Sequence, residues 1–151
     1  MSELKSKLQS DLNEAIKSRN TVVAETVRMV LSAITNEEVA GKEKKELSDA
    51  EVITVLTREA KKRREAAEAF EQGGRADRAA AERAEGEVIA SYLPEQLSED
   101  EIKKLITETI ASVGASGPAD MGKVMGTLKS KVAGKADGAM VSSLVKAALN
   151  K

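Results

Sequence analysis

The side chains available for chemistry in this chain of 151 residues are carboxylates, amines, guanidinium groups and hydroxyls, because the sequence has neither histidine nor cysteine. That composition excludes thiolate nucleophiles, disulfides, histidine general bases and the usual zinc ligands. Neighbouring carboxylates, such as Glu37 with Glu38 and Glu82 with Glu85, have the spacing of ordinary polar helix faces. The sequence therefore predicts no catalytic residue, no metal ligand and no cofactor.

One short run has the spacing of a phosphate-binding loop. The residues from Gly117 to Lys123 match that loop as far as its lysine. Val124 then takes the position where a Ser or Thr would hold magnesium, and no apolar strand precedes Gly117. The run therefore does not predict nucleotide hydrolysis.

A cluster of lysines near the carboxyl end is the stronger candidate for function. Six lysines between Ala119 and Lys151 face only Asp120 and Asp137, although the net charge of the whole chain is −1. These lysines lie close to the expected amino end of the last helix, where backbone amides favour an anion. They indicate phosphate contact or, alternatively, a solvated lysine face. The candidate RNA-binding residues are Lys123, Gly126, Lys129, Lys131 and Lys135.

Gly122 and Gly126 lie four residues apart and so share one face of the expected helix. The missing side chains let another backbone come close, which predicts packing against a neighbouring helix and equally admits an RNA backbone. A second basic patch lies in the first half, where ion pairs within the helix explain most of the charge. Its members are Arg58, Lys61, Lys62, Arg63 and Arg64.

The elements that position these residues are predicted to be helices. Apolar residues recur at intervals of three, four or seven, no strand-like alternation stands out, and the only aromatic residues are Phe70 and Tyr92. We predict an all-α fold. Residues 1–93 form an N-terminal helical domain of about four helices, in which long helices make a hairpin that turns at Gly73 and Gly74.

A short elbow at Pro94 joins this domain to a C-terminal three-helix domain over residues 94–151. A helix arriving from the N-terminal side should stop at Pro94, which lacks an amide hydrogen. Ser48 with Glu51 and Ser98 with Glu101 have the spacing of reciprocal capping boxes. Further local expectations are helix ends at Gly114 and Gly134, a cap at Asp137, an apolar stripe that includes Ile16, and an apolar face made by Ala80, Ala84 and Val88.

Several motifs together resemble the YqeY-like proteins over essentially the full length. They are Tyr-Leu-Pro-Glu-Gln-Leu-Ser from Tyr92, Asp-Met-Gly-Lys-Val-Met-Gly from Asp120, Gly-Lys-Ala-Asp-Gly from Gly134, Val-Arg-Met from Val27 and Arg-Glu-Ala-Lys-Lys-Arg-Arg from Arg58. The second half is also similar to the tail domain of the B subunit of the glutamyl-tRNA(Gln) and aspartyl-tRNA(Asn) amidotransferase. That tail is a small helical module that contacts tRNA.

The resemblance implies an all-helical, two-part fold and a link to tRNA-dependent amide transfer. It does not carry catalysis, because the regions of the amidotransferase that release ammonia and phosphorylate the carboxylate have no counterpart in this chain. Family-based labels nevertheless assign carbon-nitrogen ligase activity with glutamine as amido-N donor. By position in the tail motif, Lys123, Gly126 and Lys135 are the candidates for an RNA-facing surface, and Asp137 with Gly138 for a helix cap and its turn.

Two functions follow from these observations. The first is a non-catalytic, tRNA-associated module whose partners are a tRNA and a tRNA-dependent amidotransferase or an aminoacyl-tRNA synthetase. The alternative is a helical adaptor that docks onto a protein partner without touching RNA. No apolar run is long enough to span a bilayer and the first residues lack the apolar core of a signal peptide, so we expect a cytoplasmic protein without a membrane partner.

Overall fold

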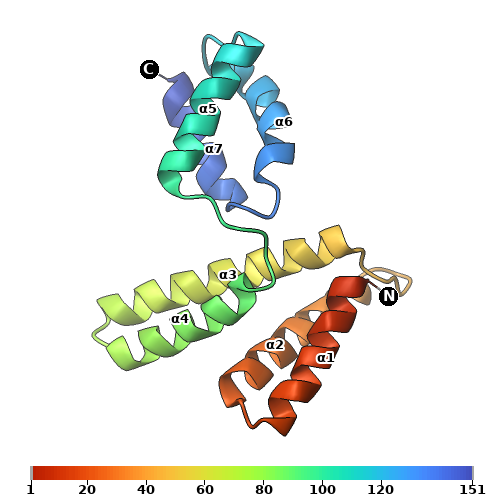
Figure 1. Cartoon of the computed structure of the whole chain (residues 1–151). Coiled ribbons are helices and arrows are strands. Elements are labelled where there is room, and N and C mark those ends of the chain that lie inside the picture. Colours follow the sequence, from red (N-terminus) through yellow and green to blue (C-terminus); the bar gives the residue numbers. More distant parts are fainter. Residues whose placement is uncertain (1, 151) are drawn as a thin grey trace. The chain divides into compact units, whose positions relative to one another are not determined.

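The structure is a computed structural model that describes residues 2–150. Those residues form seven α-helices and one short 3-10 helix, without a strand, so the predicted all-α class is confirmed (Figure 1). The chain divides into two compact units, Met1–Leu93 and Pro94–Lys151. Each unit has an apolar core of its own.

The first unit consists of two helical hairpins. Helices α1 (Glu3–Lys17) and α2 (Thr21–Glu38) form one, and the longer helices α3 (Asp49–Gln72) and α4 (Ala76–Ala90) form the other (Figure 1). Ser48 and Glu51 make the predicted reciprocal capping box at the start of α3. The hairpin turns at Gly73 and Gly74, as predicted, with Gly74 in the left-handed region at φ 76°.

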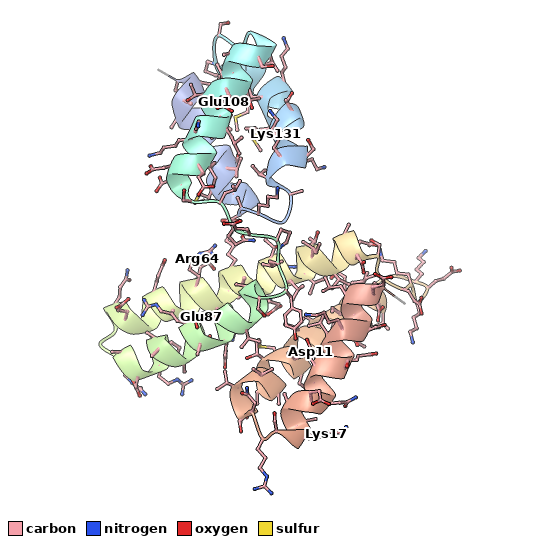
Figure 2. The ribbon with its side chains drawn as sticks, in the orientation of Figure 1. Asp11, Lys17, Arg64, Glu87, Glu108 and Lys131 are labelled. Carbon is pink, nitrogen blue, oxygen red and sulfur yellow. The ribbon has the colours of Figure 1, made fainter. Side chains whose placement is uncertain are left out.

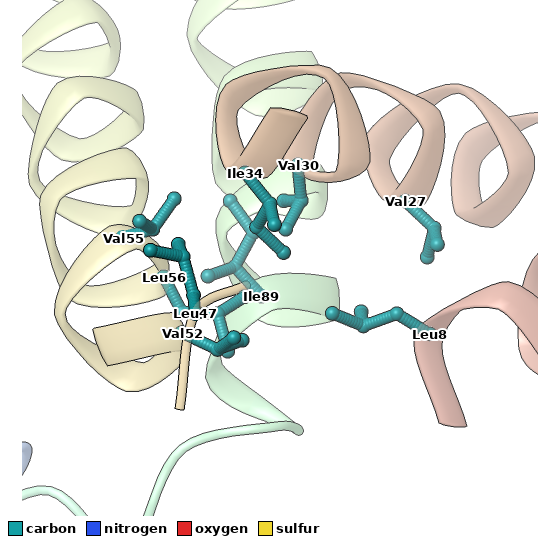
Figure 3. Packing of buried hydrophobic residues seen from close by; sticks show 9 residues of the cluster. All are labelled: Leu8, Val27, Val30, Ile34, Leu47, Val52, Val55, Leu56 and Ile89. Atoms are coloured by element: carbon teal, nitrogen blue, oxygen red, sulfur yellow. The ribbon is translucent and has the colours of Figure 1, made fainter. Parts of the chain in front are cut away.

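The core of the first unit is aliphatic and draws on all four helices (Figure 3). Its buried members are Leu8 of α1, Val27, Val30 and Ile34 of α2, Leu47 of the α2–α3 loop, Val52, Val55 and Leu56 of α3, and Ile89 of α4. Full burial of each large aliphatic side chain stabilises the fold by roughly 1.5–3 kcal/mol. Because Leu47 is only 2% exposed, the loop before α3 is drawn into the core as well.

Tyr92, the only tyrosine, fastens the chain after α4 to α1. Its hydroxyl donates to the Asp11 carboxylate at 2.6 Å, and the Lys7 ammonium lies 4.8 Å from the ring centre. Burial, followed by the contact with Asp11, raises the pKa of the Tyr92 hydroxyl above its ordinary value. The hydrogen bond therefore holds the segment after α4 against α1.

The turn between α1 and α2 is closed by Arg19, whose backbone is left-handed at φ 59°. Within residues 2–150 no other residue apart from glycine has a positive φ. The Arg19 amide donates to the Ile16 carbonyl at 3.2 Å and the Asn20 amide to the Ala15 carbonyl at 2.9 Å, a Schellman pattern in which glycine is usual at this position. A side chain here costs about 1 kcal/mol.

Two of the predicted apolar faces are only partly correct. In α1 the residues Leu4, Leu8 and Leu12 face the core as predicted, and in α4 Val88 packs against it. Ile16 is 50% exposed, because α1 turns Leu8 and Ala15 inward and leaves Ile16 at the edge. In α4 the buried apolar residues are Ala79 and Ile89, whereas the predicted face is exposed or half-buried. Alanines occur on every side of α4, so the spacing of its apolar residues does not single out one face. The burial of Ile89 in the core decides which face of α4 points inward.

The second unit is a three-helix bundle of α5 (Glu99–Val113), α6 (Met121–Val132) and α7 (Gly138–Leu149), with the 3-10 helix η1 (Pro118–Asp120) before α6 (Figure 1). Gly114 ends α5 in the left-handed region at φ 68°, and Gly134 follows α6 at φ 72°. Both were predicted helix ends. The fully buried core side chains of this unit are Ile102, Ile106, Val124, Leu128, Val141 and Val145.

The segment before α5 differs from its prediction in two details. Helix α4 ends at Ala90, ahead of Pro94, because the amides of Tyr92 and Leu93 already bond three residues back in tight turns. The Glu101 amide donates to Ser98 Oγ at 3.1 Å as predicted, but the second bond runs from the Ser98 hydroxyl to the Glu101 carboxylate at 3.0 Å. The capping box of α5 is therefore only half formed.

Candidate RNA-binding face

Helix α6 turns small residues and lysines to solvent. Its buried residues are Val124, Leu128 and Val132, and the opposite side of the helix is exposed. A Cβ atom placed on Gly122 or Gly126 would meet no neighbouring heavy atom within 4 Å. The predicted packing of these glycines against another helix is therefore not found within the second unit, because the apolar stripe of α6 faces the core from the other side.

Two lysines flank the glycine pair. At about 100° per residue, Lys123 lies about 60° round the helix from Gly126 on one side, and Lys129 about 60° on the other. We call Gly122, Lys123, Gly126 and Lys129 the α6 face. Lys131, which Figure 2 labels, lies about 80° beyond Lys123 and so points away from the glycines.

The lysines of this region have no ion-pair partner among residues 2–150 within 4.0 Å. Asp120, at the start of α6, accepts from the Ser116 amide at 2.8 Å, and this bond is the main reason that the pKa of Asp120 lies below its ordinary value. The charge of Lys123 lowers the same pKa by a smaller amount. Asp120 thus offsets part of the field of Lys123 but not that of Lys129.

Lys135 lies in the turn between α6 and α7, and this turn is tied to the first residues of the second unit. The Lys135 carbonyl accepts from the Leu97 amide at 2.8 Å, and the Gly134 carbonyl accepts from the side-chain amide of Gln96, also at 2.8 Å. The two motifs that contain these residues lie far apart in the sequence but meet in the fold. The Lys135 side chain itself is exposed.

A carboxylate of the chain lies at the amino end of α7. The Asp137 carboxylate accepts from the Ala139 amide at 3.3 Å and so caps the helix, as predicted. An external anion at this helix end would compete with that carboxylate. The positive charge of the region comes from its lysines alone.

The sequence matches the family model of the YqeY-like proteins over residues 5–149, nearly the whole chain. The chain belongs to the YqeY-like family. The match includes both the α6 face and the basic run of α3, which lie in different units of the fold. The resemblance noted from the motifs is thereby confirmed.

Two mitochondrial proteins of fungi are among the relatives of this YqeY-like chain. It is 34% identical over 116 residues to altered inheritance of mitochondria protein 41, mitochondrial, of Clavispora lusitaniae, and the match covers 75% of this chain but 66% of that protein, just under two thirds. It is 28% identical over 133 residues to the protein of the same name in Pyrenophora tritici-repentis, covering 86% and 71% of the two chains.

Over residues 2–150 of this YqeY-like chain, every helix is too short or too polar to cross a bilayer.

The basic run of α3 is largely neutralised by carboxylates. Arg64, labelled in Figure 2, is the one member with no carboxylate within 4.0 Å among residues 2–150. The pairs of the other four are Lys61–Glu65 at 4.0 Å, Lys62–Glu59 at 3.3 Å, Arg58–Glu37 at 3.7 Å and Arg63–Glu82 at 3.2 Å. The first two lie within the helix, as predicted, whereas the last two tie α3 to α2 and α4. This patch therefore has little free charge to offer an anion.

Two carboxylates that the sequence assigned to ordinary polar helix faces, Glu38 and Glu82, instead contact a distant basic residue within the first unit of this YqeY-like protein. Glu38 is 3% exposed and accepts two bonds from the Lys5 ammonium, at 2.8 and 3.0 Å. The contact with Lys5 is the main reason that the pKa of Glu38 lies below its ordinary value. Glu82 faces Arg63 across the α3–α4 hairpin. The partner of each lies far away in the sequence, so only the fold reveals the pair.

Proposed function

We propose that this YqeY-like protein is a non-catalytic module that binds tRNA through its second unit. The observation that carries the proposal is the α6 face, where exposed helix backbone at Gly122 and Gly126 lies between two lysines. No carboxylate pairs with Lys123 or Lys129 among the described residues. Lysines contact nucleic-acid phosphates and supply most of the affinity of non-specific binding, and the glycines between them let a sugar–phosphate backbone come close to the helix.

Folded RNA suits this surface better than a single strand. Single-stranded RNA is commonly held by aromatic side chains on which the bases stack, but Phe70 and Tyr92 are the only aromatic residues and both lie in the first unit. Double-stranded regions are recognised by shape and by phosphate contacts, which a lysine-flanked helix can provide. The expected dissociation constant is in the range of about 10⁻⁴ to 10⁻⁶ M at physiological salt, as for other non-specific electrostatic contacts.

The proposed setting is tRNA-dependent amide transfer in the cytoplasm, next to an amidotransferase or an aminoacyl-tRNA synthetase. The support for it is the similarity of the second half to the tail domain of the amidotransferase B subunit, through the motifs that contain Lys123, Gly126 and Lys135. In this proposal the protein holds tRNA and performs no amide transfer itself.

The test is binding of labelled tRNA to the full chain, measured by fluorescence anisotropy over a series of salt concentrations. The test variant combines Lys123→Gln, Lys129→Gln and Lys135→Gln. The matched control removes three lysines from other parts of the same unit, as Lys103→Gln, Lys104→Gln and Lys146→Gln. Because each lost phosphate contact lowers the slope of log K against log salt by about one, the test variant should lose about three units of slope.

If both triple variants lost the same affinity for tRNA, the α6 face would be rejected as the binding site, because the loss would then reflect only the lower positive charge of the protein. Absence of wild-type binding at low salt would reject tRNA binding altogether. In that case the adaptor alternative is tested by partner capture, which should survive in the Lys123, Lys129 and Lys135 variant.

A further inference from the structure

A groove runs along the outer side of the α1–α2 hairpin in the first unit. It consists of two adjoining hollows, of about 370 and 280 Å³, that share Arg28 as a common wall. The first lies at the turn between the helices and the second further along α2. The side chains that carry the argument are Leu12, Ile16, Arg19, Ala24, Arg28 and Leu31.

Apolar side chains of both helices lie in the groove beside polar ones such as Thr21, Ser32 and Thr35. Leu12 and Leu31 are half-buried and pack on the core of the first unit, and Ala24 is buried. Ile16 is 50% exposed and lines the hollow at the turn. A lone exposed isoleucine is ordinary, but here it continues an apolar surface that is already concave. Such a surface is suited to apolar side chains of a partner.

Two arginines without an ion-pair partner in the described part of the chain also line the groove. Arg19 and Arg28 both line the groove, and no carboxylate of residues 2–150 lies within 4.0 Å of either guanidinium group. Glu25 lines the same hollow without pairing with them. Arg19 also holds the left-handed backbone position where glycine would be unstrained.

We propose that this groove binds an amphipathic helix of a partner protein, whose apolar stripe lies on Leu12, Ile16 and Leu31. Carboxylates at the edges of that stripe pair with Arg19 and Arg28. A helix is the natural occupant because the groove lies between two helices and is walled by both. RNA fits less well, since Leu12, Ile16 and Leu31 offer it no polar partner and Glu25 repels phosphate. The site lies in the first unit and does not depend on tRNA binding by the second.

The probe is a displayed library of helical peptides with a fixed leucine stripe and randomised flanking positions, selected on the full chain. Selected sequences should be enriched in Asp and Glu beside the stripe. One enriched peptide is then labelled and its affinity measured by fluorescence anisotropy. We expect Arg28→Gln and Ile16→Glu each to weaken binding roughly tenfold or more, as for other central contacts of a small interface.

Arg64→Gln is the matched control, because Arg64 is likewise exposed and unpaired but lies on α3. It should leave the affinity unchanged. Failure to select any binder, selection of basic flanks, or equal effects of Arg28→Gln and Arg64→Gln would overturn the proposal. So would a wild-type dimer that Ile16→Glu dissociates in analytical ultracentrifugation, because a second copy would then fill the groove. Binding of labelled tRNA that Arg28→Gln abolishes would assign the groove to RNA instead.

Discussion

Replacement of Lys5 by methionine should destabilise the first unit. Among the charged side chains of this unit that are at least partly exposed, we expect no other single replacement to cost more. The Glu38 side chain is 4% exposed and that of Lys5 15%, so the pair lies close to the buried limit. In Lys5→Met the carboxylate keeps only the Leu47 amide, at 3.4 Å. Removal of one partner from a buried pair costs about 3 kcal/mol or more, because the remaining charge is left without compensation.

The reverse change, Glu38→Leu, should cost less. The Lys5 ammonium is partly exposed and can extend into water on its flexible stem, so the main loss is the bond to the Leu47 amide. We expect about 2 kcal/mol. In the double variant no charge is left buried, and replacing a buried ion pair by apolar groups is often neutral, so the expected loss is only about 1 kcal/mol.

The assay is urea unfolding followed by tyrosine fluorescence. Tyr92 is the only tyrosine, the chain has no tryptophan, and the ring packs inside the first unit, so its emission reports that unit. The coupling energy is the sum of the losses in the two single variants minus the loss in the double variant. For Lys5→Met and Glu38→Leu we expect it to exceed about 2 kcal/mol, which is above the usual range for exposed pairs. Additive losses, with coupling below about 0.5 kcal/mol, would refute the reasoning that this pair is buried and mutually compensated.

Three further outcomes are expected. Gly126→Ala should stabilise the second unit by about 1 kcal/mol in thermal unfolding, since the exposed helix position has room for a methyl group, yet weaken tRNA binding. Arg19→Gly should stabilise the first unit by about 1 kcal/mol in the tyrosine assay, and a loss would show that its φ is not strained. Because the folded-state pKa of Glu38 lies below 4.5, its stabilisation is complete above that pH and is lost as the pH falls through the folded value. The Lys5→Met, Glu38→Leu double variant should lack this component of acid unfolding.

Features that depend on neighbouring residues were predictable from the sequence. The capping box at Ser48, the turn at Gly74 and the left-handed stop at Gly114 all follow from side chains within one helical turn. The all-α class follows from spacing in the same way. These signals are local, and nothing distant in the chain overrides them.

Features that depend on distant residues were not predictable. From the sequence, Glu38 has the spacing of an ordinary polar helix face, because its partner Lys5 lies 33 residues earlier and comes beside it only in the fold. The rotation of α4 was wrong because alanine occurs on every side of it, and only the burial of Ile89 decides between faces. Of the candidate site, the sequence identified the lysines but could not show that no neighbouring atom of the fold covers Gly126.

The bonds from Gln96 and Leu97 to the turn that carries Lys135 also define a path for mechanical load. The covalent chain enters the second unit at Pro94, so any pull arriving along it reaches these two bonds before it reaches the helices of the bundle. Tension on the connection would therefore act first on the Gly134–Lys135 turn and leave the aliphatic core untouched. Tension transmitted along the chain from the first unit would therefore reach the second unit first at the turn that contains Lys135.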